Sequence, residues 1–257
     1  MAQKKLAYDR LKQRNKRRMR RQRLALWLLL VCMLVIVATL CMTVFFKIES
    51  VSVSGDHPYR DEEVLAKADI VLGSNLFKLD KKGVKTRVET ALPYVESVYV
   101  DRRWPAAVVL KVTTAHPMCQ IRHGEYYVLL SEKLKVLEVA SQPFFGVTTV
   151  SGVPCEEAFV GYPLNTGEDE KIGQILTQVV PCAESAGLAV GDLHIDLTNR
   201  YAVKLFWAGF EIRAGNYLNM EEKLSFAKKI IERVGADAVG VVEVSDAQTQ
   251  GSFIPAG

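Results

Sequence analysis

Few side chains in this sequence are placed to hold a metal ion. The closest approach to a ligand cluster is the stretch His116-Pro-Met-Cys119-Gln-Ile-Arg-His123. Side chains three residues apart on a strand point to opposite faces, so His116 and Cys119 would not converge on one ion. The spacing also matches no zinc-binding pattern. We therefore expect no metal site and no cofactor.

The acidic and nucleophilic side chains are no better placed for catalysis. Glu156 and Glu157 are adjacent in sequence, as are Glu221 and Glu222, so the two carboxylates of each pair point apart and do not resemble a glycosidase pair. No P-loop, G-x-S-x-G, H-E-x-x-H or dinucleotide-binding glycine pattern occurs. The sequence therefore predicts no catalytic residue and a protein that is not an enzyme.

Three cysteines, Cys119, Cys155 and Cys182, follow the apolar N-terminal region that holds Cys32 and Cys41. None of the three has a sequence context typical of a catalytic thiol with a partner histidine. An odd number cannot pair completely, and the sequence leaves open whether two of them form a disulfide.

The first 46 residues are typical of a membrane anchor. Residues 1–23 carry eleven lysines and arginines and one acid, and residues 24–46 then contain no charged side chain. As a helix, these 23 residues would extend about 34 Å, enough to cross a hydrocarbon core of ~30 Å. A cleaved signal peptide is the alternative, but Val44, Phe45, Phe46 and Lys47 make a poor cleavage site. We therefore predict a basic arm over 1–23 and an uncleaved signal anchor from Leu24 to Phe46.

The charge distribution predicts the topology. Lys47 is the only basic residue within ten positions after the apolar run, so the positive-inside rule places the N-terminus in the cytoplasm and residues 47–257 outside it. The rest of the chain carries 22 basic and 28 acidic residues. The basic charge is thus confined to a short arm, and we expect membrane lipid but no nucleic acid as a partner.

Residues 47–115 are predicted to form a small sheet with two helices on one face. Val51 and Val53 alternate with serines as in a half-buried strand, and Asp61 to Glu63 suit the first turn of a helix. Helical spacing from Phe77 to Ala91 predicts a second helix that ends at Pro93. Val98 and Val100, and then Val108 and Leu110, alternate in two strands joined at Arg103-Trp104-Pro105. The expected order is therefore β-α-α-β-β.

Residues 116–245 are predicted to form a mixed, strand-rich domain with helices, followed by a tail over 246–257 that is flexible except around Phe253. Tyr126–Leu130 and Val136–Val139 suggest one hairpin. A helix over 168–180 is expected to end at Pro181. A later helix is expected to begin at Asn219, with Glu222 reaching back in a capping box, and to end at Gly235.

One segment allows a different interpretation. Residues 179–197 include Ala186-Gly-Leu188 and Gly191-Asp192 before a strand, and they resemble a stretch of PDZ domains. The upstream Phe159-Val-Gly-Tyr-Pro163 is a poor carboxylate-binding loop. We favour a helix-to-strand connection, and retain a signal-anchored, PDZ-like peptide-binding or protease-regulatory protein as the alternative function.

Five short phrases, in order behind the anchor, resemble the POTRA domain of the FtsQ/DivIB cell-division proteins. They are Val51 and Val53 before Gly55, Glu62-Glu63-Val64, Gly73-x-Asn75-Leu76-Phe77, Leu92-Pro93-Tyr94-Val95 and Arg103-Trp104-Pro105. The later parts Gly124–Leu129, Tyr201–Leu224 and Val239–Ser245 resemble the family's β domain more loosely. A secretion or transport POTRA protein would usually have repeated units or an attached barrel, and neither is evident.

The resemblance implies an α+β protein that consists of a transmembrane helix, a POTRA domain and a β domain. It further implies a non-enzymatic scaffold at the division septum of the cell membrane. Such a scaffold would bind FtsL-like and FtsB/DivIC-like proteins, with other divisome components as further partners. It would help to recruit and control septal peptidoglycan synthesis.

The resemblance also implies where partners bind, because the family's partner adds to an open sheet edge. Carried over to this sequence, that edge comprises Val241, Val242, Glu243 and Val244, with Phe253 beyond it. The matching residues of a neighbouring hairpin are Tyr201, Val203 and Leu205. Arg103, Trp104 and Pro105 are expected to be structural, with a partner role as the alternative.

Overall fold

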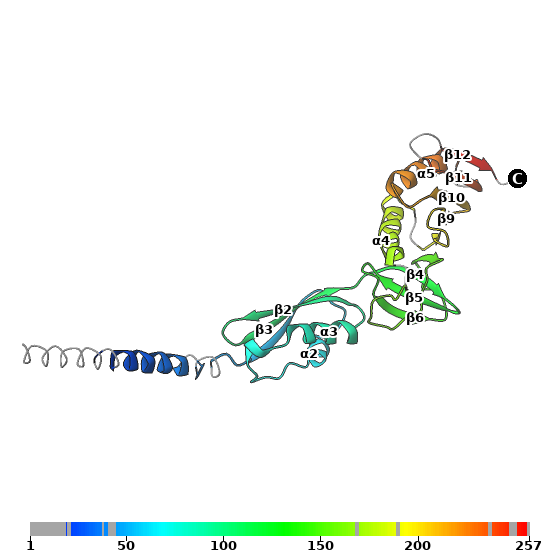
Figure 1. The fold of residues 1–257 in the computed structure, drawn as a ribbon. Helices are drawn as coiled ribbons and strands as arrows, with labels where there is room; N and C mark the ends of the chain where they lie inside the picture. Colours follow the sequence, from blue (N-terminus) through cyan, green and yellow to red (C-terminus); the bar gives the residue numbers. More distant parts are fainter. Residues whose placement is uncertain are drawn as a thin grey trace, which may run out of the picture. The chain divides into compact units, whose positions relative to one another are not determined.

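A computed structural model describes residues 19, 22–37, 39–40, 45–167, 170–188, 191–235, 238–246 and 251–255. Residues 22–37 are helical (Figure 1). Among the described residues, no helix is both long enough and apolar enough to cross a membrane. Most of the predicted basic arm, and five positions of the predicted span, lie outside the described residues.

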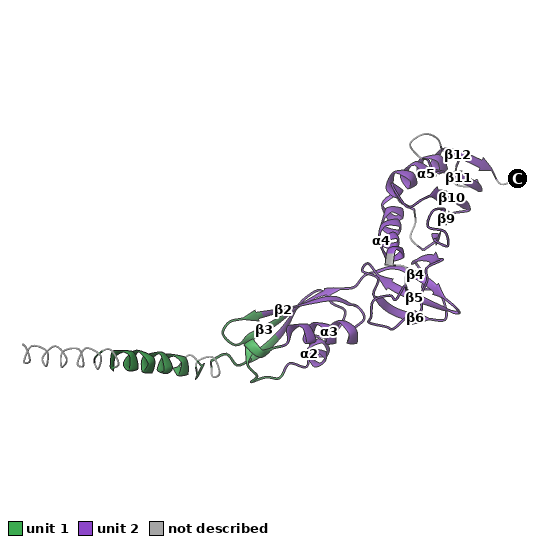
Figure 2. Ribbon diagram, viewed as in Figure 1, with its two compact units in different colours: residues 1–51, 71–79, 102–109 green, residues 52–70, 80–101, 110–257 purple. Residues whose placement is uncertain are grey.

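The contacts divide the chain into two compact units (Figure 2). Unit 1 comprises residues 1–51, 71–79 and 102–109, and unit 2 comprises residues 52–70, 80–101 and 110–257. The first part of the chain forms a three-stranded sheet in the order β1-β3-β2. Its elements are β1 (Ser50–Gly55), α2 (Asp61–Ala68), the 3₁₀ turn η1 (Leu76–Lys78), α3 (Lys81–Ala91), β2 (Val95–Arg103) and β3 (Ala107–Thr114).

This part has the predicted β-α-α-β-β order. Val98 and Val100 in β2, and Val108 and Leu110 in β3, are buried at alternate positions, as the sequence pattern indicates. The second helix begins later than the apolar spacing suggests, because the Asp80 side chain caps it by accepting a hydrogen bond from the Gly83 N–H at 3.0 Å.

The second part of the chain forms a nine-stranded mixed sheet in the order β12-β11-β10-β9-β8-β7-β4-β5-β6. Parallel pairing joins β10 to β11, β4 to β7 and β7 to β8, and the other neighbours are antiparallel. The elements are β4 (Pro117–His123), β5 (Tyr126–Ser131), β6 (Val136–Ala140), β7 (Thr148–Ser151), α4 (Glu170–Ser185), β8 (His194–Asp196), β9 (Val203–Trp207), β10 (Phe210–Gly215), α5 (Met220–Val234), β11 (Gly240–Glu243) and β12 (Ser252–Pro255).

Helices α4 and α5 supply one side of the main hydrophobic core. Their apolar stripes, which include Leu176, Val179, Leu224 and Ile231, belong to the same buried cluster as the inward-facing residues of strands β8 to β11. The residues between α4 and β8 form a helix-to-strand connection into this sheet, as the favoured interpretation of the PDZ-like segment expects.

The two helix ends differ from the prediction. Helix α4 continues through Pro181 to Ser185 instead of ending there, because Val179, Val180 and Ala183 are fully buried on both sides of the proline. Asn219 precedes α5 but has a left-handed φ of 53° and makes no side-chain capping bond, so the predicted capping box is not formed. Gly235 ends the helix as expected, with φ at 106°.

The predicted flexible tail is also corrected. Residues 252–255 form strand β12, which pairs with β11 in antiparallel register, and residues 247–250, 256 and 257 lie outside the described residues. The physical reason is that the Phe253 side chain packs against the main hydrophobic core. Its ring centroid lies 6.2 Å from that of buried Phe210.

Candidate partner-binding surface

The end of the nine-stranded sheet near the C-terminus presents one strand edge and one open face. Strand β12 is the terminal strand of the described sheet, and β11 lies between β12 and β10. The prediction that residues 241–244 form the edge strand is therefore corrected, because β12 covers them. Phe253 lies in the edge strand itself.

The predicted site residues do not all lie on the same face of the sheet. Val242 and Val244 are fully buried, and so are Val203 and Leu205 of the neighbouring strand β9. These side chains belong to the protein's own core, and a partner would not touch them. Tyr201 is 73% exposed in the turn before β9.

The outward-facing positions form a row across five strands. His194 pairs with Phe206, Phe206 with Glu211, Glu211 with Val241, and Val241 with Ile254. Since side chains alternate along each strand, these five residues share the sheet face that α4 and α5 do not cover. Phe206, next to His194 at one end of the row, is 37% exposed, and Ile254 at the other end is 55% exposed, so apolar surface is exposed in both regions.

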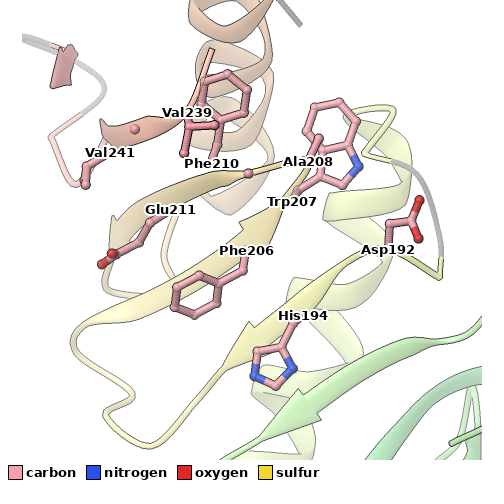
Figure 3. A pocket seen from close by; sticks show the side chains of 11 residues that line it. Asp192, His194, Phe206, Trp207, Ala208, Phe210, Glu211, Val239 and Val241 are labelled. Atoms are coloured by element: carbon pink, nitrogen blue, oxygen red, sulfur yellow. The ribbon is translucent and has the colours of Figure 1, made fainter. Parts of the chain in front are cut away.

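A shallow hollow of about 470 Å³ lies over this row (Figure 3). The end of β9 with Trp207 and the Ala208-Gly209 turn after it line one side, and Val239 and Val241 of the β11 segment line another. The Trp207 ring is held in place by Lys228, whose ammonium lies 4.2 Å from the ring centroid and donates to the Gly187 carbonyl at 3.0 Å. Most of the lining side chains are apolar, and Asp192, His194 and Glu211 are the polar or charged ones.

Charged side chains lie beside the apolar row. The Arg213 Nε donates to the Glu211 carboxylate at 2.9 Å, and the Lys204 ammonium lies 3.6 Å from the same oxygen. The Arg213 hydrogen bond is the main reason that the pKa of Glu211 lies below its usual value. Glu243, one of the predicted partner-binding residues, is on the same face and accepts a 2.5 Å hydrogen bond from the Ser245 hydroxyl.

One pair on this sheet superficially resembles catalytic machinery. The Ser151 hydroxyl lies 3.1 Å from Nε2 of His194. Within the described part of the chain, no carboxylate bonds to the other ring nitrogen, so the orienting acid of a hydrolase triad is missing. The described residues also contain no group of three or more His, Cys, Asp and Glu side chains that could hold a metal ion.

The remaining predicted residues lie in unit 1. Arg103 ends β2, and Trp104 and Pro105 form the turn to β3, with a cis peptide bond between them. Trp104 is 61% exposed and its ring contacts Phe46 and Phe77. The described cysteines Cys32, Cys119, Cys155 and Cys182 are free.

Sequence reasoning missed Phe206, Trp207, Val239 and Ile254. Alternation within a strand predicts which residues share a face, but it does not tell which strands become neighbours. The alternation of Phe206 with buried Leu205 is visible in the sequence. The strand character of Ser252–Pro255 is not, because four residues ending in proline give too short a pattern.

Comparisons with known proteins give a family-model match for the first part of the chain and relatives that align with most of its length. Residues 46–113 match the family model for the POTRA domain, FtsQ-type. The chain is 28% identical over 161 residues to the cell division protein FtsQ of Streptomyces coelicolor, a match that covers 61% of each protein and so less than two thirds of that relative. It is 27% identical over 204 residues to FtsQ of Syntrophotalea carbinolica, covering 79% of this chain and 71% of the relative. It is 24% identical over 225 residues to the cell division protein DivIB of Clostridium botulinum, covering 87% of this chain and 86% of the relative. The expected resemblance is confirmed.

Proposed function

We propose that this chain, which carries an FtsQ-type POTRA domain and resembles FtsQ and DivIB over most of its length, is a non-enzymatic, membrane-anchored scaffold of the cell-division machinery. It binds FtsL-like and FtsB/DivIC-like proteins outside the cytoplasm, and helps to recruit and control septal peptidoglycan synthesis. The basic arm over 1–23 stays in the cytoplasm, and residues 24–46 cross the membrane once.

The exposure of the N-terminal helix supports the membrane anchor. Leu24 is 69% exposed, Trp27 72% and Leu34 70%, although all three are large apolar side chains. Transfer of such surface from water to an apolar environment is favourable by roughly 25 cal/mol per Å². A lipid bilayer would provide that environment around a single helix without a protein partner.

The single observation that carries the partner-binding role is the open face and edge at the β12 end of the sheet. An extended partner segment could pair with the free side of β12 through its backbone. Side chains of that segment could then cover Ile254, and parts of the partner beyond the paired strand could extend over the open face toward Val241 and the hollow beside Phe206. Glu211, Arg213 and Lys204 would supply charged contacts at the rim, which favour specificity more than affinity.

The test is a binding measurement on the full chain in detergent micelles, with the extracytoplasmic parts of the host's FtsL-like and FtsB/DivIC-like proteins. We expect the Ile254→Asp change to weaken binding about tenfold or more, because it places a charge on an apolar contact that becomes dehydrated. Val139→Asp is the matched control. Val139 is a 37% exposed residue of β6, at the opposite edge of the same sheet.

A truncation after Asp246 separates two modes of binding. If the partner pairs with β12, the truncated chain loses binding. If the partner replaces β12 and pairs with β11, the truncated chain binds more tightly, since it no longer has to displace its own strand. Equal binding by the wild type, the Ile254→Asp variant and the truncated chain would exclude this surface as the partner site.

A further inference from the structure

Unit 1 carries exposed apolar side chains that the scaffold role does not use. Trp104 is 61% exposed, Phe45 67%, Val71 68% and Leu72 62%. They come from three segments of the chain: the end of the apolar run, the loop before η1, and the β2–β3 turn. All three segments belong to the same compact unit (Figure 2). Exposed apolar side chains gathered in this way usually mark a contact surface.

Aromatic contacts hold this surface together. The Phe46 ring centroid lies 5.1 Å from that of Phe77 and 5.3 Å from that of Trp104, and the Phe77 and Trp104 centroids are 4.9 Å apart. The three rings meet edge to face, a favourable arrangement for aromatic pairs. Trp104 is thus fixed in position and yet mostly exposed.

The backbone ties the same segments together. The Leu76 N–H donates to the Phe46 carbonyl at 2.8 Å, the Ile48 N–H to the Ser74 carbonyl at 2.9 Å, and the Gly73 N–H to the Ile48 carbonyl at 2.8 Å. The residues that directly follow the apolar run are therefore joined to the loop that carries Val71 and Leu72. Phe46, the last residue of the run, is thus itself hydrogen-bonded to the folded domain.

Basic side chains lie on the same three segments as the apolar ones. Lys47, Lys78 and Arg103 are exposed and belong to the same three segments. Ammonium and guanidinium groups pair well with phosphate oxygens, and tryptophan is enriched where a membrane meets water. Apolar rings flanked by cations therefore match the chemistry of an anionic lipid headgroup layer.

We propose that this juxtamembrane patch, defined as Phe45, Phe46, Val71, Leu72, Phe77 and Trp104, lies in the headgroup layer of the membrane that residues 24–46 cross. Lys47, Lys78 and Arg103 contact the lipid phosphates. The inference rests on the membrane anchor proposed above. Chain continuity favours lipid over a protein as the occupant, because Phe46 is both the last residue of the apolar run and a member of the ring cluster.

The test uses the three tryptophans of the chain, Trp27, Trp104 and Trp207, as reporters. The full chain is reconstituted in vesicles of phosphatidylglycerol and acyl-brominated phosphatidylcholine. In the Trp27→Phe, Trp207→Phe variant, we expect bromine to quench Trp104 fluorescence about twofold relative to unbrominated vesicles. The matched control carries the additional changes Trp104→Phe and Tyr201→Trp, because Tyr201 is 73% exposed and belongs to unit 2. We expect no quenching in this control.

A third variant, Trp104→Phe with Trp207→Phe, retains only Trp27 and reports whether the apolar run has inserted. Quenching of Trp27 without quenching of Trp104 would overturn the patch and leave the anchor intact. If neither Trp27 nor Trp104 were quenched, the result would contradict the membrane anchor and therefore also the juxtamembrane patch. If the Tyr201→Trp control were quenched as strongly as Trp104, the protein would be adsorbing nonspecifically to the vesicles. That result would also overturn the proposal.

Discussion

At the scale of single residues, burial decides the chemistry of the cysteines. Cys119 is fully buried in strand β4, and desolvation raises the pKa of its thiol to about 12. Burial also raises the pKa of Cys155 and of Cys182, which are both only partly covered. Because the thiolate is the reactive form, Cys119 behaves as a small apolar core residue.

We predict that Cys119 resists iodoacetamide at about pH 8.5 in the folded chain and reacts after denaturation in urea. The raised pKa of Cys119 also makes the free energy of unfolding depend on pH. Between the ordinary thiol pKa near 9 and the folded value of about 12, the unfolded chain binds fewer protons, so the free energy of unfolding falls as the pH rises. Mass spectrometry of the alkylated peptides measures the protection. Rapid native labelling of Cys119 would contradict the burial.

At the scale of elements, alternation and helical spacing were sufficient to predict most helices and strands. Val98, Val100, Val108 and Leu110 are buried as predicted, and Gly235 ends α5. The strand order could not be predicted, because parallel pairs such as β7–β8 join segments more than forty residues apart. The edge was misplaced for the same reason, since only tertiary pairing brings Ser252–Pro255 next to β11.

Helix α4 offers a test of how burial competes with local propensity. Pro181 is exposed inside the helix, where its missing N–H and its ring both disfavour helical structure. We predict that Pro181→Ala raises the free energy of unfolding by about 1–3 kcal/mol, because a helix-compatible residue replaces the proline without loss of core packing. Urea unfolding followed by circular dichroism measures this change.

Pro143→Ala is the control, because Pro143 is an exposed proline in a loop. Its replacement by alanine is expected to be neutral or to lower the free energy of unfolding slightly, because it only increases the conformational entropy of the unfolded chain. If both substitutions had the same effect, helix α4 would not continue through Pro181.

At the scale of the whole molecule, a buried lysine connects the α3 region to the β domain within unit 2. Lys135 is 7% exposed, and its ammonium donates to the carbonyl oxygens of Glu89 in α3, Leu92 just after it (3.2 Å) and Val95 at the start of β2 (2.6 Å). Desolvation lowers the pKa of this lysine. Because the last carbonyls of a helix lack intrahelical donors, the cation supplies a donor to the Glu89 carbonyl. It is a second donor to the Leu92 carbonyl, which also accepts a hydrogen bond from the Val95 N–H at 3.0 Å.

We predict that Lys135→Met lowers the free energy of unfolding by about 2–4 kcal/mol, because three carbonyl oxygens lose their hydrogen bond from the buried ammonium. Lys133→Met, two residues away at an exposed position, is expected to have almost no effect. The comparison is a urea titration of the full chain in detergent micelles. Equal unfolding free energies for the two variants would show that the ammonium does not stabilise this connection.

The proposed function requires that this chain acts at the site of cell division. The most direct measurement is fluorescence microscopy of dividing host cells in which the full chain, tagged at its N-terminus, is the sole copy. We predict a fluorescent band at the septum, and a weaker band for the Ile254→Asp variant, because binding of its partners would be reduced. Fluorescence spread evenly around the membrane of cells that are visibly constricting would contradict the claim.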